Sequence, residues 1–224
     1  MHTNAAPSDP THTLAQACAA LGLTLPDSLL ATLLDYLNLL QRWNRVYNLT
    51  ALRDPAEMLS HHLIDCLAVL PALQAHAAHQ AQPLNILDVG SGGGLPGVVL
   101  AITHPEWQVR CVDTVSKKAS FIRQVAAELR LPNLHGVHAR VETLLPEQHG
   151  CNLITSRAFA SLADFTRLTQ HLLNPGGVWM AMKGKLPDDE RAQLPANVDV
   201  FHVEQLQVPG LDAQRCLVWM RPAA

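Results

Sequence analysis

The sequence predicts an α/β protein: a doubly wound, mostly parallel sheet that ends in an antiparallel hairpin, with a helical extension at the N-terminus. Three observations lead to this prediction. Short apolar runs alternate with helical patterns from residue 84 onward, an order typical of parallel sheets with helices on both faces. A glycine-rich turn, LDVGSGGGLPG at Leu87–Gly97, joins the first run to a helix. The last two runs are separated by only a short loop, which indicates an antiparallel pair.

Length and composition describe one sizeable domain with a small additional part. The chain has 224 residues, is 48% hydrophobic and carries a net charge of −3. Its apolar content is sufficient for a hydrophobic core, and its net charge does not indicate a nucleic-acid partner. No apolar run reaches the ~20 residues of a membrane span, and the polar start is unlike a signal peptide. The five cysteines lie far apart and form no CxxC pair, which favours reduced thiols. We therefore expect a cytoplasmic protein without a membrane span or a metal site.

The first third of the chain is expected to be helical. Apolar side chains recur every three or four residues from Leu29 to Trp43, after a start at Pro26, which predicts an amphipathic helix. A second helix is expected from Pro55 to about Leu70. The predicted division is a flexible tail at 1–13, a helical region packing on the core at 14–82 and the α/β domain at 83–224.

The elements of the sheet follow from the alternation of apolar runs and helical patterns. The predicted parallel strands are Asn85–Val89, Gln108–Asp113, Leu134–His138, Asn152–Ser156 and Val178–Lys183. The helices predicted between them are Pro96–Thr103, Ser116–Leu131 and Ser161–Leu173. The hairpin is predicted at Val198–Val208 and Cys216–Arg221.

The glycine-rich turn predicts a nucleotide-like ligand, because glycine lets the backbone approach a ligand closely and the next helix offers free N–H groups. The dinucleotide pattern G-x-G-x-x-G fits only from Gly92, beyond the expected strand end. The pattern D-x-G-x-G-x-G fits from Asp88 to Gly94 and resembles motif I of the S-adenosylmethionine (SAM) methyltransferases. Asp113, at the end of the second strand, would accept hydrogen bonds from ribose hydroxyls. An NAD-linked oxidoreductase would use the same acid, so this alternative stays open.

Further segments resemble the RsmG (GidB) family of bacterial methyltransferases, which methylate guanine N7 in 16S ribosomal RNA. They are, in order, RWNRVYNLTALRD, HHLIDCLAVLP, LDVGSGGGLPGVVLAI, VDTVSKKASFIRQV, ARVETL, SRAFASL, MAMKGKLPDDE and VPGLDAQRCLV. The resemblance extends from about Leu29 to Met220; at Cys66 relatives commonly have serine. It implies a Rossmann-like class I SAM methyltransferase fold and SAM as cofactor. It also implies the small ribosomal subunit or its assembly intermediate as partner, with guanine 527 of the decoding-site loop as target.

The resemblance and the residue pattern together assign roles to particular side chains. Arg157 is expected beside the methyl donor, facing the guanine, as the catalytic residue. The expected cofactor contacts are Asp88, Gly90, Ser91, Gly92, Leu95, Asp113, Val141, Glu142 and Arg157. The expected RNA contacts are Asn48, Thr50, His62, Lys117, Lys118, Arg123 and Lys183.

Several of these residues also have a purely structural interpretation. Arg157 would also suit an ion pair with Asp164 at a helix start. His61 and His62 are interpreted first as a pair on a helix surface. Asn48 and Thr50 serve equally well as caps of a turn.

Trp43 and Tyr47 are interpreted mainly as core residues rather than as platforms for bases.

For the expected reaction, guanine N7 already carries a free lone pair, so alignment matters more than a strong general base. A non-catalytic factor that binds SAM or RNA remains an alternative that only a turnover assay separates from an enzyme.

Overall fold

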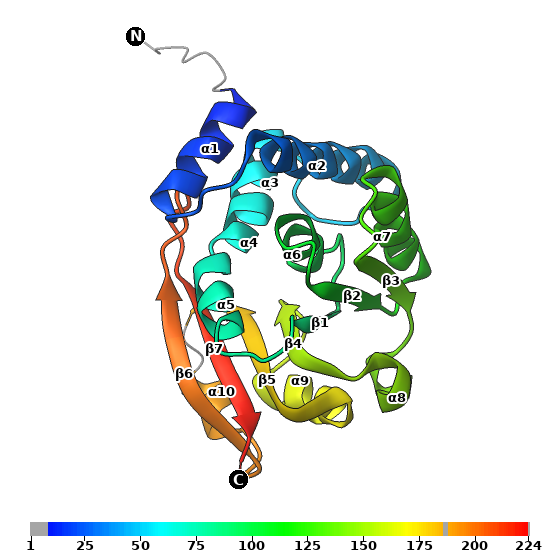
Figure 1. The fold of residues 1–224 in the computed structure, drawn as a ribbon, viewed down its shortest axis with the longest axis vertical. Helices are drawn as coiled ribbons and strands as arrows, with labels where there is room; N and C mark the ends of the chain where they lie inside the picture. Colours follow the sequence, from blue (N-terminus) through cyan, green and yellow to red (C-terminus); the bar gives the residue numbers. More distant parts are fainter. Residues whose placement is uncertain (1–8, 186–187, 224) are drawn as a thin grey trace.

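The computed structural model describes residues 9–185 and 188–223. Within these residues a seven-stranded sheet runs through the molecule in the order β3-β2-β1-β4-β5-β7-β6 (Figure 1). The strands are β1 (Asn85–Val89), β2 (Gln108–Asp113), β3 (Leu134–His138), β4 (Cys151–Arg157), β5 (Leu173–Lys183), β6 (Val198–Leu206) and β7 (Arg215–Pro222). The first five pair in parallel, and β7 pairs antiparallel with both β5 and β6. The predicted doubly wound sheet with a closing hairpin is confirmed.

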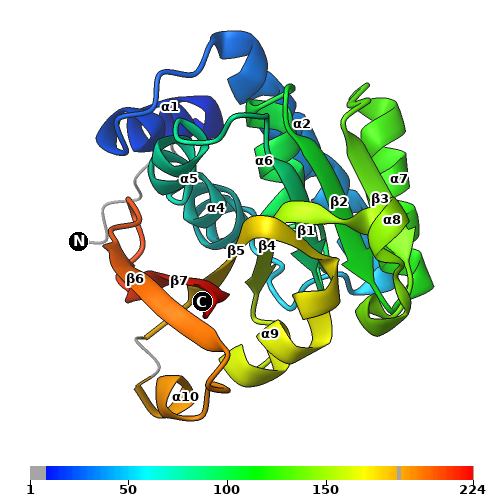
Figure 2. The ribbon, with the colours of Figure 1, turned by 60° about the horizontal axis from the view of Figure 1, so that its bottom comes forward.

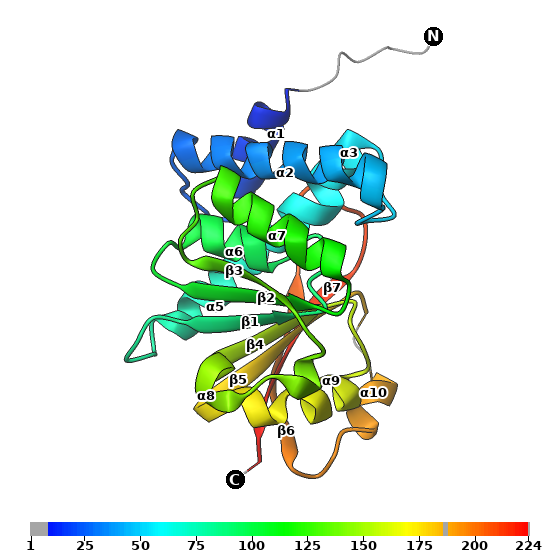
Figure 3. The ribbon, with the colours of Figure 1, turned by 90° about the vertical axis from the view of Figure 1, so that its right-hand side faces the viewer.

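Helices cover both faces of the sheet (Figure 3). α2 (Asp27–Tyr47), α6 (Gly97–Thr103) and α7 (Ser116–Glu128) lie on one face. The other face carries α8 (Pro146–His149), α9 (Leu162–Thr169), a 3-10 turn at Gln170–Leu172, and α10 (Asp188–Ala192). A short 3-10 turn at Val141–Thr143 follows β3. Each face has its own buried apolar cluster, so the sheet is shielded from water on both sides.

The start of the chain differs from the prediction. α1 spans Pro10–Ala20, so the expected flexible tail is wrong for residues 10–13; residues 1–8 lie outside the described part. Asp9 caps this helix, because its carboxylate accepts the Thr11 N–H at 3.0 Å, and proline is favoured at the first helical position. The pair Asp9-Pro10 in the sequence therefore indicates the start of this helix.

The second predicted helix is a longer, interrupted stretch. It contains α3 (Pro55–Met58), a π-helical turn (Leu59–Ile64), α4 (Asp65–Leu67) and α5 (Leu70–Ala77). By length and composition this stretch is apolar enough to cross a membrane, but 67% of its most apolar window is buried inside the protein. α5 lies beside β7 (Figure 2), where the rings of His76 and Trp219 are 5.2 Å apart. The stretch is thus a core helix that joins the N-terminal region to the sheet.

Two further expectations are settled by the described residues. The fifth parallel strand begins at Leu173 rather than Val178, because the preceding helix ends earlier and residues 173–177 form an irregular start of the strand, where Gly176 has a φ of 78° and the register with β4 shifts. All five cysteines are free and buried, as expected of small core residues.

Candidate functional site

Two buried acids fix the glycine-rich turn between β1 and α6. Asp88 accepts the N–H of Gly97, the first residue of α6, at 2.8 Å. Asp113, at the end of β2, accepts the N–H of Gly92 at 3.1 Å. Gly90 and Gly92 have positive φ angles of 66° and 58°, which side chains other than glycine rarely adopt. The turn lies where β1 is flanked by β2 and β4, the switch point at which such sheets bind ligands.

Two cavities open on either side of this turn and share Gly90 and Ala158 in their linings. The first, about 240 Å³, is lined by Val89, Gly90, Val112, Asp113, Thr114, Val115, Lys118, Ala139, Val141, Glu142, Ala158 and Phe159. The second, about 450 Å³, is lined by Leu49, Thr50, Leu52, His61, His62, Asp65, Gly90, Ser91, Gly92, Gly93, Leu95, Arg157, Ala158, Met182, Lys183, Gly184 and Arg215. The two cavities therefore adjoin at Gly90 and Ala158.

The first cavity has the composition of a nucleoside site. Val112 and Val141 supply apolar walls, while Asp113 and Glu142 supply carboxylates. Asp113 is already engaged, because it also accepts the Val115 N–H at 2.8 Å and lies 3.5 Å from the Lys118 ammonium. A carboxylate has about four lone-pair sites, so Asp113 can hold the turn and still accept a ribose hydroxyl.

The turn itself has open space beside Gly92 and an unpaired carboxylate oxygen buried behind it. A Cβ at Gly92 would meet only the Gly90 carbonyl oxygen, at 4.0 Å, whereas a Cβ at Gly90 would overlap the Phe159 ring. Asp88 is fully buried, and its Oδ1 has no hydrogen-bond partner within the described residues. Burial raises the pKa of Asp88 to about 7. Asp88 lines neither cavity, but its carboxylate, when ionised, attracts a cationic group that binds at the turn. Together with the open side of Gly92 and the two carboxylates of the first cavity, this fits SAM.

A buried ion triad forms the far wall of the second cavity. Arg157 donates from Nη1 to Asp65 Oδ2 at 3.0 Å and to the His61 carbonyl at 2.9 Å. Asp65 Oδ1 accepts from Arg215 Nε at 2.8 Å. The Asp65 side chain is only 3% exposed. The alternative pairing of Arg157 with Asp164 is wrong, since Asp164 pairs with Arg167 at 2.7 Å.

His62 is part of the same wall. It is buried, with Nε2 2.7 Å from Thr50 Oγ1 and Nδ1 3.4 Å from Arg157 Nη2. Arginine can only donate, so Nδ1 is the acceptor and Nε2–H donates to Thr50. Burial, and next the Arg157 charge, lower the pKa of His62 to about 4. The interpretation of His62 as a surface residue is wrong, while His61 is half-buried and lies 2.9 Å from Ser60 Oγ.

The remaining predicted RNA contacts are distributed unevenly. Asn48 ends α2 in the left-handed conformation and accepts from Arg53 at 2.8 Å, and Arg123 donates to the Gly136 carbonyl at 3.0 Å. Neither lines the two cavities. Lys183 lines the second cavity, but its ammonium is held by Glu190 at 2.9 Å. Lys117 is exposed on the first turn of α7.

Sequence reasoning missed Asp65, Arg215 and Phe159. A readable signal existed for Asp65, since a charged residue interrupts an apolar helical run at HHLIDCLAVL and buried charges are rarely unpaired. No signal identified Arg215 or Phe159, which come to the site only through folding. Within the described residues, no group of three or more His, Cys, Asp or Glu side chains is arranged to hold a metal ion.

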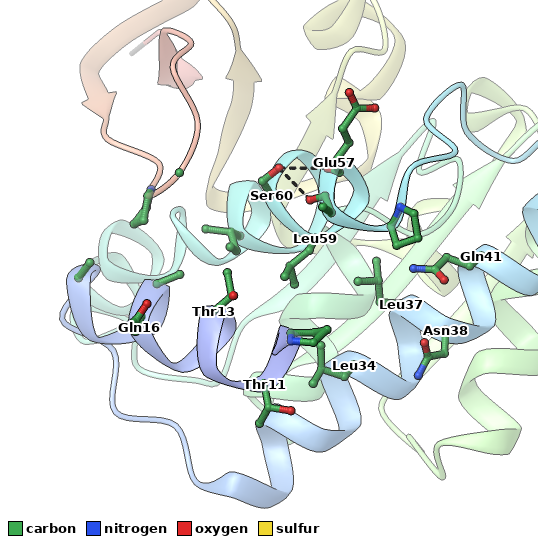
Figure 4. Close-up of a pocket in the computed structure, with 18 residues that line it drawn as sticks. Thr11, Thr13, Gln16, Leu34, Leu37, Asn38, Gln41, Glu57, Leu59 and Ser60 are labelled. Carbon is green, nitrogen blue, oxygen red and sulfur yellow. Dashed lines mark hydrogen bonds between the residues drawn. The ribbon is translucent and has the colours of Figure 1, made fainter. Parts of the chain in front are cut away.

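A larger cavity than these two lies elsewhere. It measures about 1050 Å³ and lies between α1, α2 and α3, where Leu34, Leu37 and Leu59 face one another (Figure 4). It contains none of the strand-end acids or arginines described above. Size alone therefore does not mark the functional site in this protein.

Comparison with known proteins gives the family. Residues 29–218 match the family described as GidB, rRNA small subunit methyltransferase G. The chain belongs to this family. A protein named ribosomal RNA small subunit methyltransferase G from Acidovorax sp. (strain JS42) is 58% identical over 219 residues, covering 95% of this chain and 96% of that protein. One of the same name from Leptothrix cholodnii is 60% identical over 210 residues, covering 94% of each.

Solved structures support the fold of this GidB-family chain. MtNAS in complex with MTA and tNA aligns with a TM-score of 0.58 at 14% identity, over 94% of this chain and 82% of that one. A SAM dependent methyltransferase from Aquifex aeolicus aligns with a TM-score of 0.53 at 16% identity, over 75% of this chain and 93% of that one. The predicted class I methyltransferase fold and the predicted family are both confirmed.

Proposed function

We propose that this protein transfers the methyl group of SAM to N7 of a guanine in 16S ribosomal RNA. The relatives that this chain matches over nearly their whole length are named small-subunit rRNA methyltransferases. Their names favour methyl transfer to RNA over hydride transfer by an NAD-linked oxidoreductase. The wall of the second cavity is the observation that supports N7 as the acceptor atom. There the carboxylate of Asp65 is occupied by two arginines and His62 by Arg157 and Thr50.

This wall suits a nucleophile that needs no deprotonation. With a pKa of about 4, His62 is neutral near pH 7, and its two nitrogens are both engaged. When bound, SAM supplies a methyl group on a sulfonium, which the lone pair of guanine N7 can attack directly. The contribution of the protein is then to align the acceptor, and alignment alone accounts for large rate effects.

Arg157 is the residue that performs this alignment. Its guanidinium has five N–H donors, and only three contacts are recorded for it among the described residues. Arg157 lines the second cavity with 21% of its side chain exposed, so donors remain for a group bound there. Donation to guanine O6 would fix the ring and leave N7 free for the methyl group.

The cofactor is assigned to the two cavities by their chemistry. Asp113, Val141 and Glu142 would hold the nucleoside in the first cavity, and the open side of Gly92 would accept the amino-acid part. Asp88 acts behind the turn, where its ionised carboxylate favours a nearby cation. Gly90, which lines both cavities, would then border the reacting end of the cofactor.

The partner is the small ribosomal subunit or an assembly intermediate, with guanine 527 as the target position. These particles are cytoplasmic, and the five free, buried thiols of this chain suit a reducing compartment. The experiment is methyl transfer from labelled SAM to small subunits purified from cells that lack the enzyme. Borohydride and aniline treatment should then cleave the RNA at the labelled guanine, because only an N7-methylated base is sensitive. Label at another atom would refute the acceptor assignment, and absence of transfer would favour a non-catalytic factor.

A further inference from the structure

A shallow hollow of about 550 Å³ lies outside both cavities, between the end of α2 and the start of α7. It is lined by Trp43, Tyr47, Val115, Ser116, Lys117 and Ser120. Tyr47 and Val115 are 40% and 36% exposed, and they are among five large hydrophobic side chains exposed in the described residues. Two of those five side chains therefore meet at one place on the surface.

The aromatic side of the hollow is supported from the core. The Trp43 ring lies 5.4 Å from Phe121, which is fully buried, and 5.1 Å from Tyr47, which is at the surface. The three rings form a row that leads from the interior to solvent. Because Tyr47 is held from beneath, it loses little freedom when a flat group stacks on it. The hollow thus offers a rigid aromatic face.

The opposite side of the hollow is cationic. Lys117 is exposed and has no ion-pair partner among residues 9–185 and 188–223. The first turn of α7 contains no acidic residue, and no side chain caps it. An aromatic face beside a free ammonium is the chemistry that binds a base together with its phosphate.

The hollow is continuous with the site already described. Val115 lines both the hollow and the first cavity. Tyr47 ends α2, and Leu49 and Thr50, which follow in the chain, line the second cavity. The hollow therefore adjoins the first cavity, and the segment that follows Tyr47 leads from the hollow to the second cavity.

We propose that the hollow binds an unpaired nucleotide of the RNA substrate, with its base stacked on Tyr47 and its phosphate near Lys117. This inference rests on the proposed RNA substrate. Six residues line the hollow, whereas stable protein interfaces use roughly 20–30 residues a side. The charge and the size therefore favour one nucleotide over a protein segment or a second copy of the chain.

The chain offers a direct optical probe. Of its four tryptophans, Trp107, Trp179 and Trp219 are at most 3% exposed, and Trp43 is half-buried in the hollow. Adding oligoadenylate, which has no guanine to methylate, should quench the fluorescence of the full chain. The Trp43→Phe variant should show no quenching. Equal quenching in both proteins would overturn the proposal.

The decisive comparison uses a matched control. Tyr47→Ala should raise the KM for small subunits roughly tenfold, in the range for loss of one stacked base, and leave kcat and SAM affinity unchanged. Tyr47→Phe should retain the wild-type KM. Phe201→Ala is the control, because Phe201 is also 40% exposed and lies 5.2 Å from a cation, Arg221, but belongs to the edge strand β6.

The outcomes separate this inference from the proposed function. Methyl transfer by the wild-type protein tests the function, and only the variants test the hollow. An unchanged KM for Tyr47→Ala, or an equal rise for Phe201→Ala, would overturn the inference while transfer continues. Weaker binding to intact subunits with unchanged binding to protein-free RNA would also overturn it, in favour of a ribosomal protein.

Discussion

Removal of the Asp65 carboxylate should destabilise the protein and displace Arg157. Asp65 lies on α4 and joins Arg157 at the end of β4 to Arg215 at the start of β7. Breaking a buried ion pair by removing one partner costs about 3–5 kcal/mol. Because the two guanidinium groups remain 21% and 24% exposed, water can partly solvate them. We therefore expect a loss of about 3 kcal/mol for Asp65→Ala, at the lower end of that range.

The measurement is urea or thermal unfolding followed by circular dichroism. A loss of this size corresponds to a fall in Tm of roughly 6–12 °C for a chain of this length. Asp65→Asn keeps the shape and one acceptor, so its loss should be about half as large. The control is Asp164→Asn, which removes an exposed pair with Arg167 at 2.7 Å, where the two side chains are 51% and 66% exposed. Such an exposed pair contributes little to stability, so the Asp164→Asn variant should unfold close to the wild type.

Loss of the Asp65 carboxylate should also lower the rate of methyl transfer. At a temperature where Asp65→Asn is folded, kcat should fall while SAM affinity is retained, because Arg157 loses its anchor but the glycine-rich turn does not. Equal stability of the Asp65→Asn and Asp164→Asn variants would refute the view that this carboxylate holds the two arginines. Retention of full kcat by Asp65→Asn would refute its role in placing Arg157.

The remaining predictions concern the cofactor turn and the chemistry. Gly92→Val should abolish SAM binding in a folded protein, since φ is 58° there and the side chain would enter the open space; unchanged affinity in calorimetry would show that SAM binds elsewhere. SAM affinity should fall as the pH drops below about 7, because Asp88 has its pKa raised to about 7 and a cationic ligand favours its ionised form. Asp88→Asn should bind weakly without this dependence. With SAM and RNA both saturating, the single-turnover rate should be flat from about pH 6 to 9, since His62 titrates near 4; a bell-shaped profile would indicate a general base. Arg157→Ala should lower kcat more than SAM affinity, and Arg157→Lys should recover only part of the rate, because a point charge does not replace a planar fork of donors.

The fold was predictable because its signals are local. The alternation of apolar runs identified every strand of the sheet, and the turn glycines marked the end of β1. Asp113 was predictable because it ends a strand next to that turn. Each of these inferences needs only neighbouring residues and the rule that ligands bind at the switch point of such sheets.

The second cavity was not predictable in the same way. Asp65 is 92 residues from Arg157 and 150 from Arg215 along the chain, and no short pattern links them. The surface interpretation of His62 was wrong because the side chains that engage it, Thr50 and Arg157, come from other parts of the chain. No local pattern in the sequence reveals these two contacts.

The two halves of the site come from different parts of the chain. The α/β region supplies the first cavity, whereas Thr50, His62 and Asp65 of the helical region supply much of the second. The helical region also reaches the cofactor turn, because the buried Tyr36 hydroxyl donates to the Gly93 carbonyl at 2.8 Å. The predicted boundary near residue 82 therefore separates two patterns of sequence and not two functions. Under the proposed function, the sheet would hold the methyl donor and the helices would shape the place of the acceptor, and Arg157 lines the cavity where the two regions meet.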